Sequence, residues 1–200
     1  MTDAVRALVD VSALLALGDR AGLDAALAHA ATVTPDDAVE EALLQSYLFL
    51  GYPAALYGLS VWRKLRPPPP PSPAADGDLT EWQARGDATC ARVYGEQYAR
   101  LRGNVAALHP DIERWMIVEG YGKVLSRPGL DLATRELCIV ALLAPQDAAP
   151  QLYSHLRGAL NAGAPEDSVD DVVRHLEGKL PPARATMLKQ QWDAVRGRRR

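Results

Sequence analysis

An acid and an imidazole, Glu119 and His155, are the side chains whose types and positions best suit proton transfer. Glu119 continues an apolar stripe on the helix expected from Pro110 to about Leu125. Burying a carboxylate costs roughly several kcal/mol unless it is paired or protonated, so an acid on such a stripe needs a reason. His155 lies on the apolar stripe of the helix expected over Pro150–Asn161. We predict that the two act as catalytic groups that move a proton. The alternative is that both are core polar groups bonded to each other or to the backbone.

Two arginines near a tight turn are candidate contacts for a substrate carboxylate. Arg127 precedes a Pro-Gly turn, and Arg135 follows it in a helix expected to be buried. A guanidinium binds a carboxylate with two parallel hydrogen bonds, which fixes position as well as charge. Pairing of these arginines with Glu136 or with a helix C-terminus is the alternative, and it stays open at this point.

Thiol and metal chemistry have little support in the sequence. Cys90 and Cys138 cannot form a disulfide framework or a thiolate zinc site, and no metal site is predicted. Cys138 lies in the most apolar helix and Cys90 in a helix expected over Leu79–Arg102, so both are predicted to be small core residues. The sequence also lacks a Gly-rich phosphate loop, H-E-x-x-H and G-x-S-x-G.

The elements that must position these residues are helices throughout. Ala and Leu dominate, strand-type alternation is absent, and 48% of the residues are apolar. Helix starts are explicit at Thr34-Pro35-Asp36, at Asp78 with Glu81, and at Asp131. An all-α fold follows. The net charge of -3 predicts no attraction to nucleic acid or to an anionic membrane.

A proline run divides the chain. Five consecutive prolines begin at Pro67 and favour an extended spacer. We expect a first helical repeat over residues 1–66 and a Pro-rich linker over residues 67–77. A second repeat, with extra N-terminal helices and the site, should cover residues 78–195, before a basic tail over residues 196–200.

The two repeats become visible when the chain is shifted by about 130 residues against itself. Pro35 then lies over Pro165 and Trp62 over Trp192, while Ala26 lies over His155. This predicts an internal duplication of a three-helix unit, with the imidazole in the second copy alone. Chance similarity between Ala/Leu-rich helices is the alternative.

One uncharged stretch, Ala42–Trp62, is long enough to span a bilayer. Gly51-Tyr52-Pro53 would break a helix at its midpoint, so we interpret it as two short buried helices. The N-terminus lacks the features of a signal peptide. We therefore expect a soluble, cytoplasmic protein with no membrane partner.

Taken together, these residues resemble the carboxymuconolactone decarboxylase family, which also contains the alkylhydroperoxidase D-like proteins. Three stretches carry the resemblance: Trp115-x3-Glu119-x-Tyr121-Gly122-x4-Arg127-Pro128-Gly129-Leu130-Asp131-x3-Arg135-Glu136-Leu137, then Leu152-x2-His155-Leu156-Arg157-x-Ala159, and Leu43-Leu44-Gln45-Ser46-Tyr47 followed by Gly51-Tyr52-Pro53. The redox branch of that family has a Cys-x2-Cys pair shortly before the histidine. Here those positions hold Ala148 and Gln151, so the chain is more similar to the decarboxylase branch.

The resemblance implies a helical bundle of the alkylhydroperoxidase D-like type that assembles as a homo-oligomer. It implies a reaction without cofactor, in which a small carboxylated molecule loses carbon dioxide and receives a proton. On this expectation His155 and Glu119 transfer the proton and Arg127 or Arg135 binds the carboxylate. Tyr121 and Tyr47 are the weaker candidates for the pocket.

Two other functions fit the same residues. The chain could be a non-catalytic oligomeric binding or structural protein that keeps the fold, since a fold does not fix a function. Alkylhydroperoxidase-like antioxidant activity through Cys138 would need an exposed, acidified thiol, which the surrounding apolar run disfavours.

Overall fold

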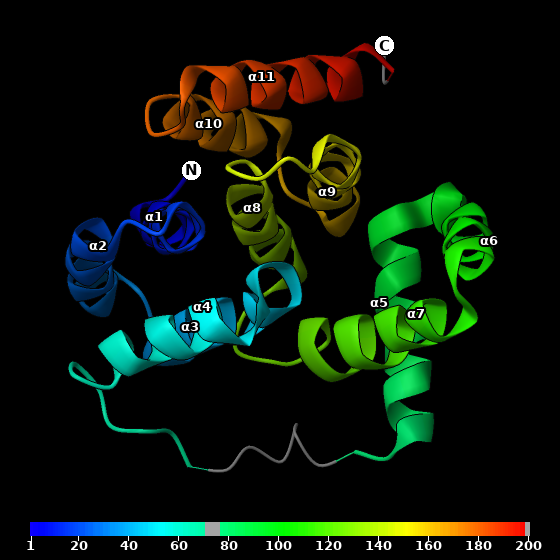
Figure 1. Cartoon of the computed structure of the whole chain (residues 1–200), viewed down its shortest axis with the longest axis horizontal. Helices are drawn as coiled ribbons and strands as arrows, with labels where there is room; N and C mark the ends of the chain where they lie inside the picture. The colour runs from blue at the N-terminus through cyan, green and yellow to red at the C-terminus, as the bar shows by residue number, and fades with distance from the viewer. Residues whose placement is uncertain (71–76, 199–200) are drawn as a thin grey trace. The chain divides into compact units, whose positions relative to one another are not determined.

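The computed structural model describes residues 1–70 and 77–198, and every regular element in these ranges is helical (Figure 1). The all-α prediction is therefore confirmed. The linker residues 71–76 and the last two residues of the predicted basic tail lie outside the described ranges. The chain forms two compact units. Unit 1 contains Met1–Pro68 and Gly129–Arg200, and unit 2 contains Pro69–Pro128.

The first half of unit 1 has four helices: α1 (Asp3–Leu17), α2 (Arg20–Val33), α3 (Asp36–Gln45) and α4 (Tyr47–Trp62). Thr2 and Asp19 accept hydrogen bonds from the first turns of α1 and α2 and so define where these helices begin. Gly18 ends α1 with φ +68°, a left-handed conformation that glycine adopts without strain.

The second half of unit 1 repeats this order with α8 (Leu132–Leu143), α9 (Ala149–Ala162), α10 (Glu166–Glu177) and α11 (Pro182–Gly197). Asp131 caps α8 by accepting a hydrogen bond from the backbone N–H of Thr134. Every residue of α8 from Thr134 to Leu143 is buried. The helix is therefore the core of unit 1, and any polar group on it must find a partner inside.

Within α4 the backbone leaves the helical conformation at Gly51, with φ 77° and ψ 169°. This confirms the break expected at Gly51-Tyr52-Pro53. Residues 42–50, before the break, are buried or half-buried as expected. The expected burial of the second piece is wrong, because Tyr52 and Leu56 are 63% and 61% exposed. Among the described helices, none is both long enough and apolar enough to cross a bilayer.

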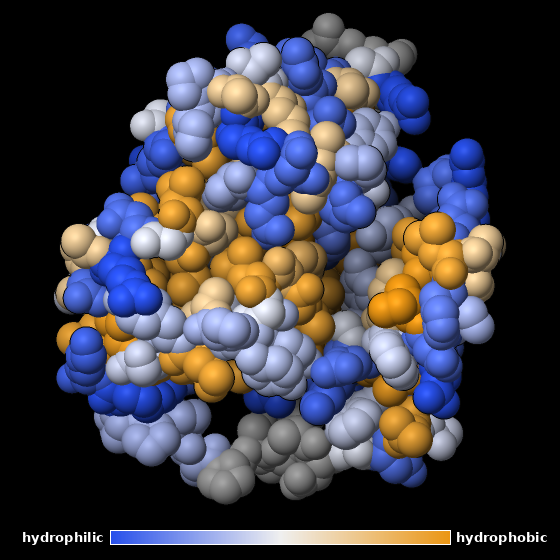
Figure 2. Space-filling view, viewed as in Figure 1, coloured by the Kyte–Doolittle hydropathy of each residue, from blue (hydrophilic) through white to orange (hydrophobic). Residues whose placement is uncertain are grey.

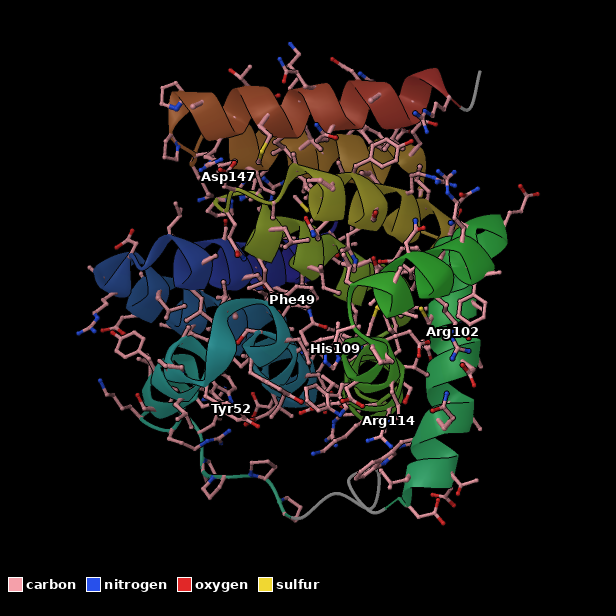
Figure 3. All side chains as sticks on the ribbon, turned by 45° about the vertical axis from the view of Figure 1, so that its right-hand side comes forward. Phe49, Tyr52, Arg102, His109, Arg114 and Asp147 are labelled. Carbon is pink, nitrogen blue, oxygen red and sulfur yellow. The ribbon has the colours of Figure 1, made fainter. Side chains whose placement is uncertain are left out.

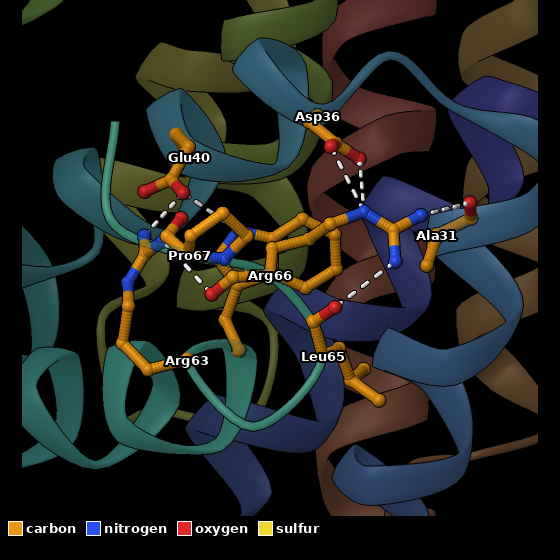
Figure 4. Close-up of polar contacts among 8 residues, drawn as sticks. Ala31, Asp36, Glu40, Arg63, Leu65, Arg66 and Pro67 are labelled. Carbon is orange, nitrogen blue, oxygen red and sulfur yellow. Dashed lines mark hydrogen bonds and ion pairs between the residues drawn. The ribbon is translucent and has the colours of Figure 1, made fainter. Parts of the chain in front are cut away.

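Arg63 and Arg66, just after α4, bind residues of α2 and α3 (Figure 4). Arg66 donates from Nε to both carboxylate oxygens of Asp36 at 2.9 and 3.0 Å, and from Nη2 to the carbonyl of Ala31 at 2.9 Å. Arg63 pairs with Glu40 and donates to the carbonyl of Pro67 at 2.5 Å. These contacts hold residues 63–67, where the proline run begins, against α2 and α3.

Equivalent contacts recur in the two halves of unit 1. Trp62 donates from Nε1 to Glu40 at 2.7 Å, and Trp192 donates to Asp170 at 2.5 Å, in each case across 22 residues. Pro35 and Pro165 precede α3 and α10 with almost identical backbone angles, φ -57° and ψ 139° against φ -59° and ψ 142°. These matches support the duplication, which we keep as an interpretation.

Unit 2 consists of α5 (Leu79–Tyr94), η2 (Gly95–Gln97), α6 (Tyr98–Leu108), α7 (Pro110–Trp115) and η3 (Met116–Leu125). Gly95, with φ 55° and ψ -130°, ends α5, so the single helix expected over Leu79–Arg102 is wrong. The helix expected from Pro110 is present, but its second part, η3, is a π-helix. Figure 2 shows apolar surface over α6 and α7, where Leu108 and Ile112 are 83% and 48% exposed.

Two glycines let α5 and η3 pack at close range. A Cβ placed on Gly86 would lie 2.1 Å from the carbonyl oxygen of Ile117, and one on Gly122 would lie 1.9 Å from that of Trp82. Both distances are far inside van der Waals contact. The crossing of these two helices therefore requires the absence of a side chain at both positions.

Candidate active site

A buried imidazole–carboxylate pair lies in the interior of unit 1. His155 on α9 and Glu136 on α8 approach with 2.8 Å between Nδ1 and Oε2. Glu136 is fully buried and His155 is 6% exposed. The ring of Phe49, from α4, packs edge-on against the imidazole with centroids 5.6 Å apart.

The local sequence explains why these groups meet. Asp131 starts α8, which places Glu136 in the second turn of a helix that is buried along almost all its length. His155 lies on the inward side of α9, between the buried residues Leu152 and Leu156, and α9 packs against α8. A carboxylate in such surroundings is retained only with a hydrogen-bonding partner, and the imidazole provides it.

The hydrogen bond between His155 and Glu136 determines which ring nitrogen of the imidazole carries the hydrogen. With the carboxylate ionised, the hydrogen on Nδ1 is donated to Glu136, so a neutral ring carries no hydrogen on Nε2. The second carboxylate oxygen, Oε1 of Glu136, is buried and has no hydrogen-bond partner among the described residues. This oxygen can therefore accept one more hydrogen bond.

Arg135, next to Glu136, has a different environment from the one predicted. Its buried guanidinium donates from Nη2 to Glu41 at 2.8 Å, and its Nε donates to the carbonyl of Leu130 at 3.1 Å. Gln45 lies 3.4 Å from Nη1 and donates to the Arg135 carbonyl at 3.3 Å. Of the alternatives left open by the sequence, pairing with an acid describes Arg135, but the acid is Glu41 and not Glu136.

The other predicted residue of unit 1, Tyr47, begins α4, two residues before Phe49. Its ring stacks on Tyr52 with centroids 5.1 Å apart. Both tyrosines therefore belong to the segment that carries the aromatic neighbour of His155. A role for Tyr47 in substrate binding remains a prediction.

Three predicted residues belong to unit 2. Glu119 is partly buried on η3 and lines a groove with Trp82 and Lys123. Tyr121 is buried and packs edge-on against Tyr94, 6.2 Å between ring centroids. Arg127 is partly buried just after η3, and its backbone N–H donates to Val124. A catalytic or binding role for Glu119, Tyr121 and Arg127 remains a prediction.

Sequence reasoning missed Glu136 as the partner of His155. A signal was present, because an acid directly before the most apolar run of the chain is as anomalous as Glu119 on its stripe. It also missed Arg85, whose Nε and Nη2 are buried without a hydrogen-bond partner in the described part of the chain. Such nitrogens are satisfied by an anion or by ordered water.

The cysteines are unsuited to redox catalysis. Cys90 and Cys138 are both buried, as predicted, and neither forms a disulfide with a described residue. Burial raises the pKa of the Cys138 thiol to about 12, against the smaller opposing effects of Ser12 and Arg135. Because the thiolate is the reactive form, Cys138 is inert near neutral pH. In the described ranges no three His, Cys, Asp or Glu side chains gather in a way that could hold a metal ion.

Comparison with known proteins identifies a family. A family model described as the carboxymuconolactone decarboxylase family matches residues 111–178, a range that includes both Glu136 and His155. The chain is 32% identical over 98 residues to a 4-carboxymuconolactone decarboxylase of Acinetobacter baylyi, a match that covers 48% of this chain and 73% of that protein. It is 36% identical over 86 residues to the nitrosuccinic acid decarboxylase npaB of Metarhizium robertsii, covering 42% of this chain and 59% of that one.

A longer match extends beyond the decarboxylases. Peroxisomal protein 2 of Schizosaccharomyces pombe is 34% identical over 135 residues, which is 66% of this chain and 63% of the yeast protein. The chain thus spans less than two thirds of that relative's length. The bacterial decarboxylase, in contrast, is covered over nearly three quarters of its length, and the family model matches the helices that carry the buried pair. The chain belongs to the carboxymuconolactone decarboxylase family.

Proposed function

We propose that this protein catalyses decarboxylation with proton transfer on a small carboxylated substrate, without a cofactor, and that His155 delivers the proton. The observation that carries the proposal is the buried hydrogen bond between His155 and Glu136. The names of two relatives, both decarboxylases, support the reaction class.

The reaction needs two things from the protein: a positive charge that binds the substrate carboxylate, and a group that donates a proton. The bond between carbon and the carboxylate breaks, carbon dioxide leaves, and the electron pair passes into the conjugated system of the substrate. A proton then adds to carbon. Protonated at Nε2, His155 supplies this proton, while Glu136 holds Nδ1–H and so orients the ring. The free oxygen of Glu136 is available to a donor on the substrate.

The substrate class that suits this reaction is an unsaturated lactone that carries carboxylates. Its charge calls for a cation. Arg135 already binds Glu41, so in our proposal it positions the helix that carries Glu136 and does not bind the substrate. Arg127 remains the candidate for the carboxylate, and Glu119 the candidate for a second proton-transfer group.

A thiol peroxidase reaction is the weaker alternative, because it would require a thiolate at a fully buried cysteine with a raised pKa. A non-catalytic binding role would keep the fold without using the pair. The orphaned buried oxygen of Glu136 favours the enzyme, since a purely structural site gains nothing from leaving that oxygen unsatisfied.

Assembly and location belong to the same proposal. We expect a homo-oligomer, and the exposed apolar side chains of Tyr52 and Leu56 on α4 are consistent with a further surface covering them. Sedimentation of the purified chain tests it: a monomer at micromolar concentration would refute this part. A cytoplasmic location stays a prediction beside the peroxisomal name of the yeast relative.

The test of the proposed reaction is release of carbon dioxide from 4-carboxymuconolactone by the purified chain. His155→Ala should lower kcat by about 100-fold or more, since general acid catalysis contributes about 10²–10⁴. His29→Ala is the matched control, because the His29 side chain is 51% exposed on α2. Full activity of a folded His155→Ala protein would refute the role of His155. Absence of turnover by the wild type on this and related carboxylated lactones would refute the substrate class.

A further inference from the structure

Unit 2 contains a groove of about 300 Å³, formed by its own helices. The first turns of α5 line one side, and α7 with the start of η3 lines the other. This volume is at the lower end of the range for sites that hold one small molecule. The lining residues are Leu79, Trp82, Gln83, Arg114, Trp115, Val118, Glu119 and Lys123.

Two aromatic side chains give the groove flat apolar walls. Trp82 is partly buried on α5, and Trp115 on α7 is 51% exposed. An exposed indole of this size is uncommon on a surface that binds nothing, because it leaves a large apolar area in water. The walls suit a ligand with a planar, unsaturated body.

Two cations in the groove lack a carboxylate partner. Lys123 lies over the Trp82 ring, 5.3 Å from its centroid, and forms no ion pair with any described residue. Arg114, labelled in Figure 3, belongs to α7 and likewise has no ion pair among the described residues. Arg102 of unit 2, in contrast, binds both Asp87 and Glu113. The groove therefore holds positive charge that its own residues do not neutralise.

Among the described residues that line the groove, Glu119 is the one acid, so the lining carries two cations and one anion. The remaining single positive charge favours a ligand with a single negative group, since Glu119 would repel a dianion. Arg114 can hold a carboxylate with two parallel hydrogen bonds, and Lys123 adds a point charge on the indole side.

We propose that this groove is a binding site for a small planar carboxylate, such as an aromatic or conjugated monocarboxylic acid. The body of the ligand packs against Trp82 and Trp115, and its carboxylate binds Arg114 and Lys123. All the residues that line this site belong to unit 2, and one of them, Glu119, is also a predicted proton-transfer group. The binding proposed here does not rest on the reaction proposed for His155 and Glu136.

Binding of 2-naphthoate tests the proposal, with the indole N–H resonances as the readout. The four tryptophans give few signals, and Trp82→Phe assigns the signal of Trp82, one of the two tryptophans in the groove. We expect 2-naphthoate to shift the Trp82 signal saturably, and the uncharged 2-naphthamide to bind at least fivefold more weakly. Arg114→Ala and Lys123→Ala should each weaken binding by about 5–10-fold, a change of about 1–1.4 kcal/mol. The affinity should also fall with added salt.

Arg100→Ala is the matched control, because Arg100 is an exposed arginine of unit 2 on α6 and does not line the groove. It should bind 2-naphthoate as the wild type does. The proposal is overturned if the Trp82 signal does not move at millimolar 2-naphthoate. Equal binding of the amide, or unchanged affinity in both cation variants, also overturns it. None of these outcomes depends on whether His155 is catalytic.

Discussion

Arg135 and Glu41 form a fully internal ion pair, 2.8 Å from Nη2 to Oε2, between two helices that belong to different halves of unit 1. Asp171 occupies the position offset from Glu41 by 130 residues, and there the N-terminal amino group is the main cause of the lowered pKa, with smaller effects of Arg174 and Arg6. The ion pair between Arg135 and Glu41 thus joins the two halves of unit 1 through buried side chains.

Breaking this ion pair should destabilise the protein strongly. Arg135→Met or Glu41→Leu alone leaves one buried charge without its partner, at a cost of about 3–5 kcal/mol in the free energy of unfolding. The double variant removes both charges and should be more stable than either single variant. Urea denaturation of the four proteins measures the cycle. Additive losses in the double variant would show that the pair is not coupled.

Two glycine substitutions should separate close packing from helix propensity in unit 2. Gly122→Ala places a Cβ against the carbonyl of Trp82 and should cost about 1–3 kcal/mol or more in the free energy of unfolding. Gly103→Ala is the control, because Gly103 lies within α6 and a Cβ there meets nothing within 4 Å. It should stabilise the helix by about 0.5–1 kcal/mol. Thermal unfolding measures the stability of both variants. If Gly122→Ala is as stable as the wild type, the close crossing of α5 and η3 is contradicted.

The hydrogen bond between Asp87 and Tyr98 should make stability depend on pH at both extremes. Tyr98 donates to Asp87 at 2.6 Å. Burial acts to raise the pKa of Asp87, but the bonds from Tyr98 and Gln83 and the charge of Arg102 outweigh it, so the pKa lies below 3.8. Burial and the bond to Asp87 raise the pKa of Tyr98 above 10.0.

The direction of each effect follows from linkage. The lowered pKa of Asp87 adds stability that is present above its unfolded value near 3.8 and is lost as the pH falls through the folded value. The raised pKa of Tyr98 adds stability that is present below 10.0 and is lost as the pH rises through the folded value. Asp87→Asn should flatten the acid side of the stability profile, measured by urea titration between about pH 2 and pH 6. Asp24→Asn is the control, because Asp24 is exposed, and it should leave the acid side of the profile unchanged. If stability falls with pH in the same way in the wild type and in Asp87→Asn, the contribution assigned to Asp87 is wrong.

The helices and their starts could be predicted because they depend on local chemistry. Asp131 and Asp78 cap α8 and α5 through their own side chains, and Gly51 breaks α4 through its own backbone. The pairing of charged side chains from distant parts of the sequence could be predicted less well. Glu41 and Arg135 are 94 residues apart, so periodicity identifies their buried faces without saying which charges meet.

Glu119 shows a second limit of prediction from the sequence, which concerns the face of the helix on which a residue lies. Its place on an apolar stripe was deduced from the α-helical repeat of 3.6 residues, but Met116–Leu125 is a π-helix with a wider repeat. Trp115 and Ile112, which the 3.6-residue repeat places on one face with Glu119, are about half exposed. The same reasoning worked for His155, because α9 is a regular α-helix.

The most direct test of the proposed role of His155 is which ring nitrogen carries the hydrogen, and nitrogen-15 NMR of the imidazole measures this. The sequence has four histidines, and His155→Gln assigns the signal. We predict that the neutral ring carries its hydrogen on Nδ1, and that Glu136→Gln changes this preference and lowers turnover. A neutral ring protonated on Nε2 in the wild type, or a His155 signal that Glu136→Gln leaves unchanged, would contradict the account.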